Sequence, residues 1–211
     1  MLEKEFVALI LRYTTNRELA TTLWKEIETV FSEEDRNFHN LSHLEQIIAA
    51  LLPFQEQIED WDTLLFAVFY HDFVYDVVEY VTDNNNEDKS ADKAEEVLEK
   101  LNYPAEKIER CRQHILATKK HELSSDPDTN FLTDADLSIL GQSPDEYEAY
   151  HKKIRKEYFI FPDPIYHAGR QKVLHQFLHM ERLFKTDAFR QRYEEMAKEN
   201  IQRELEVISF A

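Results

Sequence analysis

The sequence predicts an all-α fold, and two features of its composition support this prediction. Only two glycines, Gly141 and Gly169, occur among 211 residues, together with six prolines. A sheet protein needs a tight turn every ~8–12 residues, so this chain has few residues with which to make such turns. Long segments rich in Glu, Leu, Ala and Lys instead repeat their apolar residues at helical spacing. A chain of this length can bury the core of one helical domain, so we interpret residues 1–211 as a single compact bundle.

Ten helices are expected from this periodicity and from residues that favour helix ends. Thr15 and Asn16 can cap the second helix, and Ser143 precedes Pro144, which is tolerated in the first turn of the eighth. Two longer loops, over 80–86 and 121–130, are not domain linkers, because apolar helices resume at once on both sides. In chain order, the expected helices span residues 2–12, 16–32, 40–57, 61–79, 87–101, 104–119, 131–141, 144–159, 163–184 and 186–206.

The charge of the chain limits its partners. A formal net charge of −17 argues against a nucleic-acid backbone or an anionic membrane as the main partner, because both are negatively charged. A small anionic substrate is still compatible, since a bound cation reverses the sign of the local charge. Cys111 is the only cysteine, which excludes an intrachain disulfide and fits a cytoplasmic protein. The first residues do not have a signal-peptide composition, and no apolar run approaches the ~18 residues that span a bilayer.

A histidine and an aspartate lie in the most apolar segment of the chain, over residues 61–75. This segment is apolar nearly all round, which predicts a central, buried helix. At helical spacing Asp72 falls on the stripe of Leu65 and Val68, directly after His71. A buried carboxylate without a partner costs several kcal/mol, so Asp72 should be paired, protonated or bound to a metal. A buried His–Asp pair that satisfies helix ends is the alternative interpretation of this segment.

A second carboxylate has a similar position in the predicted helix over 131–141. Asp136 projects between Leu132 and Leu140, which predicts that it is buried. Asp134 projects to the opposite side, so we expect it to cap a helix or to support the site from outside.

Two histidines at helical spacing complete the pattern. His39 and His43 are four residues apart and share a face if their helix begins early enough. His43 borders the apolar arc that contains Leu44 and Ile47. Two histidines and two aspartates near buried faces of different helices suit a divalent metal with nitrogen and oxygen ligands: Mn²⁺, Mg²⁺, Fe²⁺, Zn²⁺ or Co²⁺.

The order of these residues resembles the HD superfamily of metal-dependent phosphohydrolases, which is named after an adjacent His-Asp pair. The residues in this order are His43, His71-Asp72 and Asp136. The chain also resembles a bacterial group of predicted HD phosphohydrolases over about residues 36–185. Four segments carry this second resemblance: Arg36 to Asn40, Asn86 to Ala91, Asp134 to Leu137, and Ile154 to Tyr158. The His-Asn-x-x-His pattern of His39 to His43 is similar to that of cyclic-nucleotide phosphodiesterases, where tyrosine stands in place of Phe38.

The resemblance implies an HD-type helical bundle with a central metal site that hydrolyses a small-molecule phosphate ester, for example of a nucleotide. The implied ligands are His43, His71, Asp72 and Asp136. By analogy with the phosphodiesterases, His39 is the candidate general acid, because the pKa of histidine lies near neutrality. The alternative is that His39 only contacts backbone at the start of a helix.

The resemblance also suggests further site residues. Asp76, four residues after Asp72, is similar to the acid that assists water attack in the stringent-response nucleotide hydrolases, and Glu87 is its rival. Arginine and lysine side chains match phosphate oxygens, and a surface ion pair is the alternative for each of them. The candidate phosphate contacts are Arg36, Lys119 and Arg155.

A second metal ion is a further expectation, because some HD proteins use extra histidines. His114 is the candidate ligand. His121 is the weaker one, because on one continuous helix it would lie ~10 Å from His114. A dinuclear-iron HD-type oxygenase is therefore an alternative function and requires His114 together with another histidine. A non-catalytic binding module that is only stabilised by metal is the third hypothesis.

Overall fold

The structure is a computed structural model that describes residues 1–78 and 85–209. Over these residues it contains ten α-helices and two 3₁₀ helices, and none of them forms a strand, which confirms the all-α prediction. The elements are α1 (Leu2–Ile10), α2 (Arg17–Val30), α3 (Leu41–Leu51), η1 (Leu52–Gln57), α4 (Trp61–Tyr70), α6 (Asn86–Lys100), α7 (Ala105–Ala117), α8 (Pro127–Asp136), η2 (Leu137–Gly141), α9 (Pro144–Glu157), α10 (Asp163–His179) and α11 (Asp187–Ser209).

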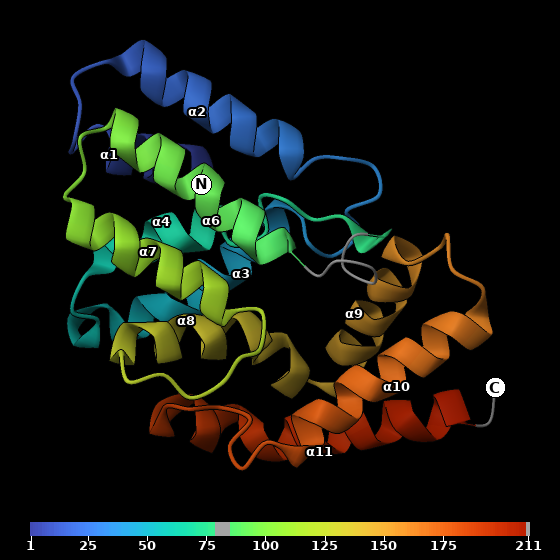
Figure 1. Cartoon of the computed structure of the whole chain (residues 1–211). Helices are drawn as coiled ribbons and strands as arrows, with labels where there is room; N and C mark the ends of the chain where they lie inside the picture. Colours follow the sequence, from blue (N-terminus) through green and yellow to red (C-terminus); the bar gives the residue numbers. More distant parts are fainter. Residues whose placement is uncertain (79–84, 210–211) are drawn as a thin grey trace.

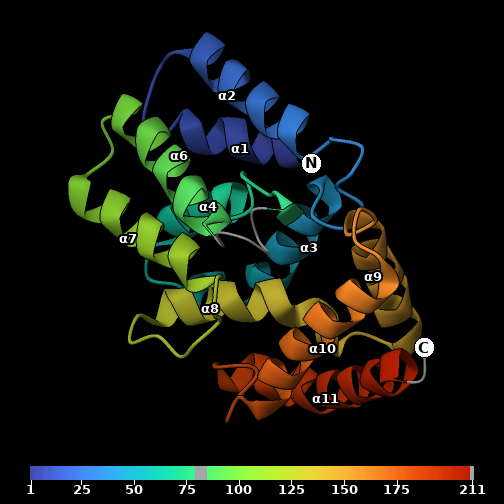
Figure 2. The same cartoon turned by 45° about the vertical axis from the view of Figure 1, so that its right-hand side comes forward.

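The helices are arranged around α3, α4 and α8 (Figure 1). Helices α1 and α2 pack against each other at one end, and α10 and α11 do so at the other. In the turned view, α9 and α10 stand beside the central helices, on the side away from α7 (Figure 2). One cluster of buried apolar residues extends from α1 to α11, so both ends share a core. No helix among the described residues has the length and apolar character needed to cross a membrane.

Helix α4 is the most buried element, as its all-round apolar sequence predicts. Each residue from Thr63 to Tyr70 is buried. The prediction that this helix continues to residue 79 is wrong, because α4 ends at Tyr70. The Arg36 guanidinium donates to the carbonyls of Asp72 at 2.7 Å and Phe73 at 2.9 Å. These carbonyls are therefore bound by a side chain rather than by amides of a following helical turn.

Several other helix ends follow from local chemistry. The Asn16 side chain accepts a hydrogen bond from the Leu19 amide at 3.0 Å, which confirms the predicted cap of α2. Ser143 forms a capping box at the start of α9, as its position before a proline suggested. The predicted helix over 40–57 is divided at Leu51, because Pro53 has no amide proton to donate.

The two predicted loops have different outcomes. The loop predicted over 121–130 is shorter, since Asp126 caps α8 and Pro127 begins it. The loop predicted over 80–86 lies largely outside the described residues.

Candidate metal centre

Three helices bring together the four residues that the sequence pattern singled out. His43 lies on α3, His71 and Asp72 follow α4 directly, and Asp136 is the last residue of α8. The Nε2 atom of His43 lies 3.1 Å from Asp136 Oδ1 and 3.8 Å from Asp72 Oδ2. The Nε2 atom of His71 lies 3.0 Å from Asp72 Oδ2 and 3.8 Å from Asp136 Oδ1. Two imidazole nitrogens therefore face two carboxylates across one small space.

Both imidazole nitrogens are buried and have no hydrogen-bond partner of acceptable geometry. His43 is 3 % exposed and His71 is 1 % exposed. The Nδ1 atom of His71 lies 2.9 Å from the Val68 carbonyl, which can only accept, so Nδ1 carries the proton and Nε2 offers a lone pair when the ring is neutral. A buried polar atom left without a partner is costly, and a cation between these rings would satisfy both. These residues therefore fit a divalent metal.

The electrostatics of the cluster also suit a cation. Burial raises the pKa of Asp136, but the hydrogen bond from His121 and the nearby imidazole of His43 outweigh it and hold that pKa well below its usual value. Burial also raises the pKa of Asp72, but the charge of His71 outweighs it and lowers that pKa. Burial lowers the pKa of His43, which keeps this imidazole neutral. His71 differs: burial opposes its protonation, yet the charge of Asp72 raises its pKa to about 9. A proton on His71 therefore competes with a metal ion.

Arg36 holds Asp72 in position and does not line the space around the cluster. Its side chain is almost fully buried, and its guanidinium lies 4.9 Å from the centroid of the Phe31 ring. The hydrogen bonds to the Asp72 and Phe73 carbonyls occupy both of its terminal nitrogens. The structure thus gives this predicted phosphate contact a positioning role.

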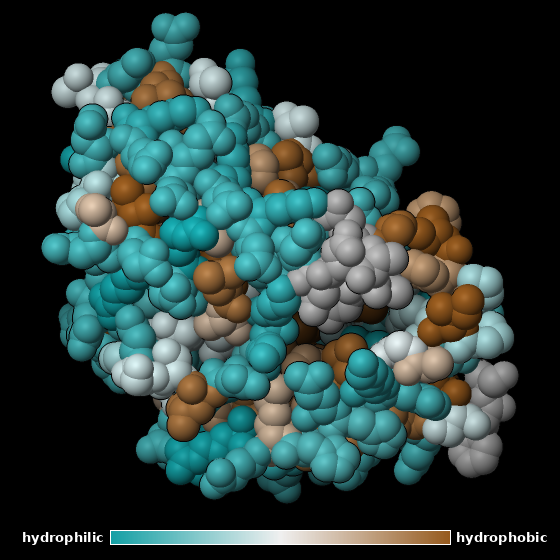
Figure 3. Space-filling model, in the orientation of Figure 1, coloured by the Kyte–Doolittle hydropathy of each residue, from teal (hydrophilic) through white to brown (hydrophobic). Residues whose placement is uncertain are grey.

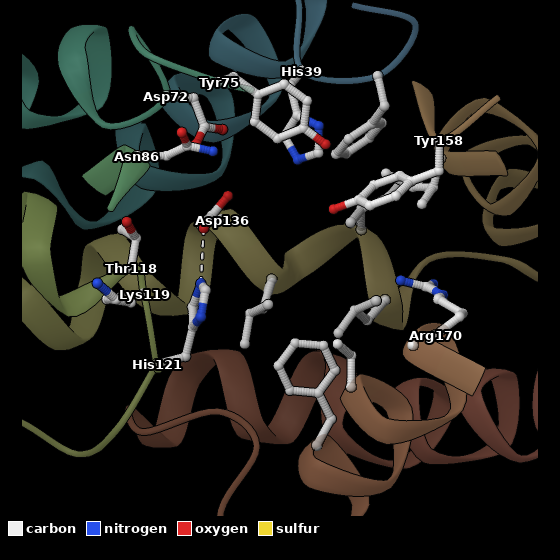
Figure 4. A pocket seen from close by; sticks show the side chains of 18 of the residues that line it. His39, Asp72, Tyr75, Asn86, Thr118, Lys119, His121, Asp136, Tyr158 and Arg170 are labelled. Carbon is white, nitrogen blue, oxygen red and sulfur yellow. Dashed lines mark hydrogen bonds and ion pairs between the residues drawn. The ribbon is translucent and has the colours of Figure 1, made fainter. Parts of the chain in front are cut away.

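A cavity of about 290 Å³ opens beside this His–Asp cluster and is lined by Asp72 and Asp136. Figure 4 shows both carboxylates at one end of this cavity, with His39 on the same side as Asp72, and His121 and Lys119 on the opposite wall.

Glu157 ties His39 to the wall of the cavity. One Glu157 oxygen accepts from the backbone amides of Phe38 at 2.6 Å and His39 at 2.9 Å. The other lies 2.7 Å from His39 Nδ1 and accepts from the Tyr75 hydroxyl at 3.0 Å. Burial lowers the pKa of His39, but the charge and hydrogen bond of Glu157 outweigh it, so the pKa is raised. His39 therefore contacts a carboxylate as well as the start of a helix, and it faces the cavity as a cation or a strong donor.

His121 is the site residue whose importance the sequence argument underestimated. Its Nε2 lies 2.8 Å from Asp136 Oδ2, the carboxylate oxygen that does not face His43 (Figure 4). The sequence argument judged His121 by its distance from His114 on one continuous helix, but α7 ends at Ala117. His121 has a positive φ of 52°, and this left-handed residue turns the chain back toward α8. The positive φ gives no signal in the sequence, because a histidine rarely adopts it.

A comparison with known protein families, curated proteins and solved structures finds no match for this chain. The chemistry of the site therefore has to follow from its own side chains and from the sequence resemblance.

His114 belongs to a different cluster. Ligand atoms of His114, Asp126 and Asp128 lie within 4.8 Å of one another, so this group could also hold a metal. Arg110 already pairs with both of its carboxylates, at 2.6 Å from Asp126 and 3.0 Å from Asp128. Both oxygens of Asp128 also accept backbone amides, from Glu59 and Asp60. The structure does not bring His114 to the cluster of His43.

The remaining predicted residues divide between the cavity and the surface. Glu87 lines the cavity, and Lys119 does so while pairing with Asp88 at 2.9 Å. Asp76 is exposed and accepts from the Val78 amide at 2.8 Å; the proposed shared helical face with Asp72 is wrong, because α4 ends before either residue.

Arg155 does not contribute to the cavity wall. Its guanidinium instead pairs with Asp163 at 2.6 Å and donates to carbonyls of the α9–α10 connection.

Proposed function

We propose that this chain is a metal-dependent phosphohydrolase of the HD type. The observation that carries the proposal is the pair of buried, unpartnered Nε2 atoms of His43 and His71, which face the carboxylates of Asp72 and Asp136. These four residues would hold one divalent cation. Their mixed nitrogen and oxygen donors suit Mn²⁺, Mg²⁺, Fe²⁺, Zn²⁺ or Co²⁺.

A divalent cation, when bound, withdraws charge from a phosphate oxygen and lowers the pKa of a bound water. His121 would hold the second oxygen of Asp136 and so fix the orientation of this carboxylate. Arg36 would fix the peptide of Asp72 through its carbonyl. The chain thus supports both carboxylates from outside the cluster.

His39 is the group that would give a proton to the leaving oxygen. Glu157 raises its pKa, which favours the protonated ring that a general acid requires. Because Glu157 holds Nδ1, the other ring nitrogen is the one left for a ligand in the cavity. Hydrolysis of a monoester would break the bond between phosphorus and the ester oxygen, which takes a proton and leaves as the alcohol, while the oxygen of water bonds to phosphorus.

Glu87 is favoured over Asp76 as the group that takes a proton from water. Glu87 lines the cavity, and its Oε2 is buried without a hydrogen-bond partner. Burial raises its pKa, which brings it closer to the value that suits a proton acceptor at neutral pH. Asp76 is exposed and is not part of the cavity wall. Lys119 and Lys120 supply positive charge at the same wall for the phosphate.

The alternatives have less support. A dinuclear-iron oxygenase requires His114 and a further histidine, yet His114 lies in the cluster with Arg110. His121 does approach Asp136, but without His114 beside it. A non-catalytic module would bind metal and melt at a higher temperature with it, but would turn over no phosphate ester.

Metal content and phosphate release test the proposal together. Protein purified without chelator is examined by elemental analysis and then screened for phosphate release with Mn²⁺, Mg²⁺, Fe²⁺, Zn²⁺ and Co²⁺. We expect one ion per chain and release with at least one metal, both lost in Asp72→Ala. Asp187→Ala, which removes an exposed aspartate at the start of α11 that is not in the cavity wall, is the matched control and should retain both. Bound metal without turnover of any ester would favour the non-catalytic module, and phosphate release by Asp72→Ala would overturn the site.

A further inference from the structure

The cavity continues away from the His–Asp cluster, between α9 and α10, and there its wall is apolar. Figure 4 shows Asp72, Asp136 and His121 at one end, with Tyr158 and Arg170 at the other. We call this second part the apolar arm. It is formed by Tyr150, Ile154, Tyr158, Tyr166 and Val173.

The outer rim of the apolar arm is apolar as well. Ile165 lines the cavity although it is 57 % exposed, and Phe159 on the same connection is 67 % exposed. Figure 3 shows hydrophobic side chains gathered on the α9–α10 connection. An apolar surface of this kind beside a cavity is typical of a ligand-binding site.

The only strong charge at the apolar arm is already neutralised. Arg170 lines the cavity, but its Nε and Nη2 donate to Glu204 at 2.7 Å and 3.0 Å. Its Nη1 donates to the Tyr150 hydroxyl at 3.3 Å. A guanidinium held in this way cannot clamp a second phosphate, so the arm favours an uncharged group.

The apolar arm has a gap in its wall at Gly169. Tyr166, Gly169, Val173 and Phe177 recur at three- and four-residue spacing, so they share the face of α10 that lines the cavity. Gly169 has no positive φ, so the backbone does not require glycine there. A Cβ atom at Gly169 would meet nothing within 4 Å, whereas at Gly141 it would lie 2.5 Å from the Tyr193 Cβ. Packing therefore explains Gly141 but not Gly169.

We propose that the apolar arm binds an uncharged aromatic group of the substrate, so that the chain hydrolyses phosphate monoesters of aromatic alcohols. Three tyrosines in the arm offer ring edges and faces that attract another ring. The Tyr166 hydroxyl is buried and has no hydrogen-bond partner, which leaves it available to a polar atom on that group. A cavity of about 290 Å³ lies near the lower end of small-molecule sites, which limits the group to one or two fused rings.

This inference rests on the proposed function only for the phosphate end. The test compares kcat/KM for 2-(1-naphthyl)ethyl phosphate and ethyl phosphate, whose leaving alcohols have similar acidity. We expect a ratio of at least about tenfold in favour of the naphthyl ester. Gly169→Leu, which fills the gap, and Val173→Asp, which places a charge in the arm, should bring the ratio toward one.

Lys172→Leu is the matched control, because it adds the same side chain to an exposed position of α10 outside the cavity. It should keep the ratio of the unmodified chain. Thermal melting shows whether each variant is folded. Gly169→Leu fills the gap and Val173→Asp adds a charge, so the test does not depend on one variant that fails to fold.

A binding measurement separates the arm from the phosphate chemistry. The fluorescence of 2-(1-naphthyl)ethanol is titrated with metal-free protein, and we expect Gly169→Leu to bind it at least about tenfold more weakly. Equal turnover of both esters would overturn the inference and leave the phosphohydrolase intact. Binding of the alcohol without any phosphate release would support the arm and overturn the phosphohydrolase. The absence of both alcohol binding and phosphate release would overturn the arm and the phosphohydrolase together.

Discussion

Replacing Asp134 or Asp136 by alanine should separate folding from metal binding, although the two aspartates are only two residues apart. Asp134 is fully buried and holds the start of α11: its oxygens accept from the Lys185 amide, the Thr186 amide and the Thr186 hydroxyl, each at 2.7 Å. Asp136 faces the other way, toward His43 and His121.

The geometry sets the size of the effect. Asp134→Ala removes three hydrogen bonds at about 1 kcal/mol each, so the free energy of unfolding should fall by roughly 3 kcal/mol. For a chain of this size, the loss corresponds to a melting temperature lower by roughly 6–12 °C. Asp136→Ala should cost the metal-free chain only about 1 kcal/mol, because it removes one hydrogen bond, the one to His121.

Urea unfolding followed by circular dichroism in EDTA measures stability, and elemental analysis of chelator-free protein measures metal content. We expect Asp134→Ala to keep most of its metal and lose stability, and Asp136→Ala to lose its metal and keep most of its stability. The assignment of the two carboxylates would be refuted by equal metal loss in both variants, or by a larger loss of metal-free stability in Asp136→Ala.

Three further predictions concern protons. Because the pKa of His71 is raised to about 9, Mn²⁺ affinity should fall by up to about tenfold for each pH unit below that value, and a pH-independent affinity between about pH 6 and pH 9 would contradict this. Glu157→Gln should reduce kcat by about 10–100-fold with a smaller change in KM. It should also move the alkaline limb of the kcat profile to lower pH, since Glu157 raises the pKa of His39; an unchanged profile would argue against His39 as the acid. Glu204→Gln should lower the free energy of unfolding by about 3–5 kcal/mol at neutral pH, because it leaves Arg170 buried without its carboxylate. Despite burial, His151 and Arg170 depress the pKa of Glu204. The stabilisation is therefore complete above about pH 4.3 and is lost as the pH falls toward the pKa of the folded state. Urea unfolding at about pH 7 and pH 3 should show that the difference in the free energy of unfolding between wild type and variant becomes smaller in acid.

The all-α architecture and most helix positions could be predicted because they depend on local patterns. Apolar periodicity located α4 as the buried central helix, and the caps at Asn16 and Ser143 lie where their side chains bind amides two or three residues ahead. The end of α4 could not be predicted, since it depends on Arg36, which lies 36 residues before Asp72 in the chain.

The site divides in the same way. Asp72 and Asp136 were singled out because a carboxylate on an apolar stripe is a local anomaly, and the structure brings both to His43 and His71. The contact between Glu157 and His39 could not be predicted, because the two residues are 118 positions apart in the chain.

The central claim is that His43, His71, Asp72 and Asp136 bind one divalent cation. Anomalous diffraction from crystals grown with Mn²⁺ and collected at the manganese edge tests it most directly. We predict one strong peak in coordination contact with all four side chains. A chain without a peak at this position, or with its peak between His114, Asp126 and Asp128 instead, would contradict the claim.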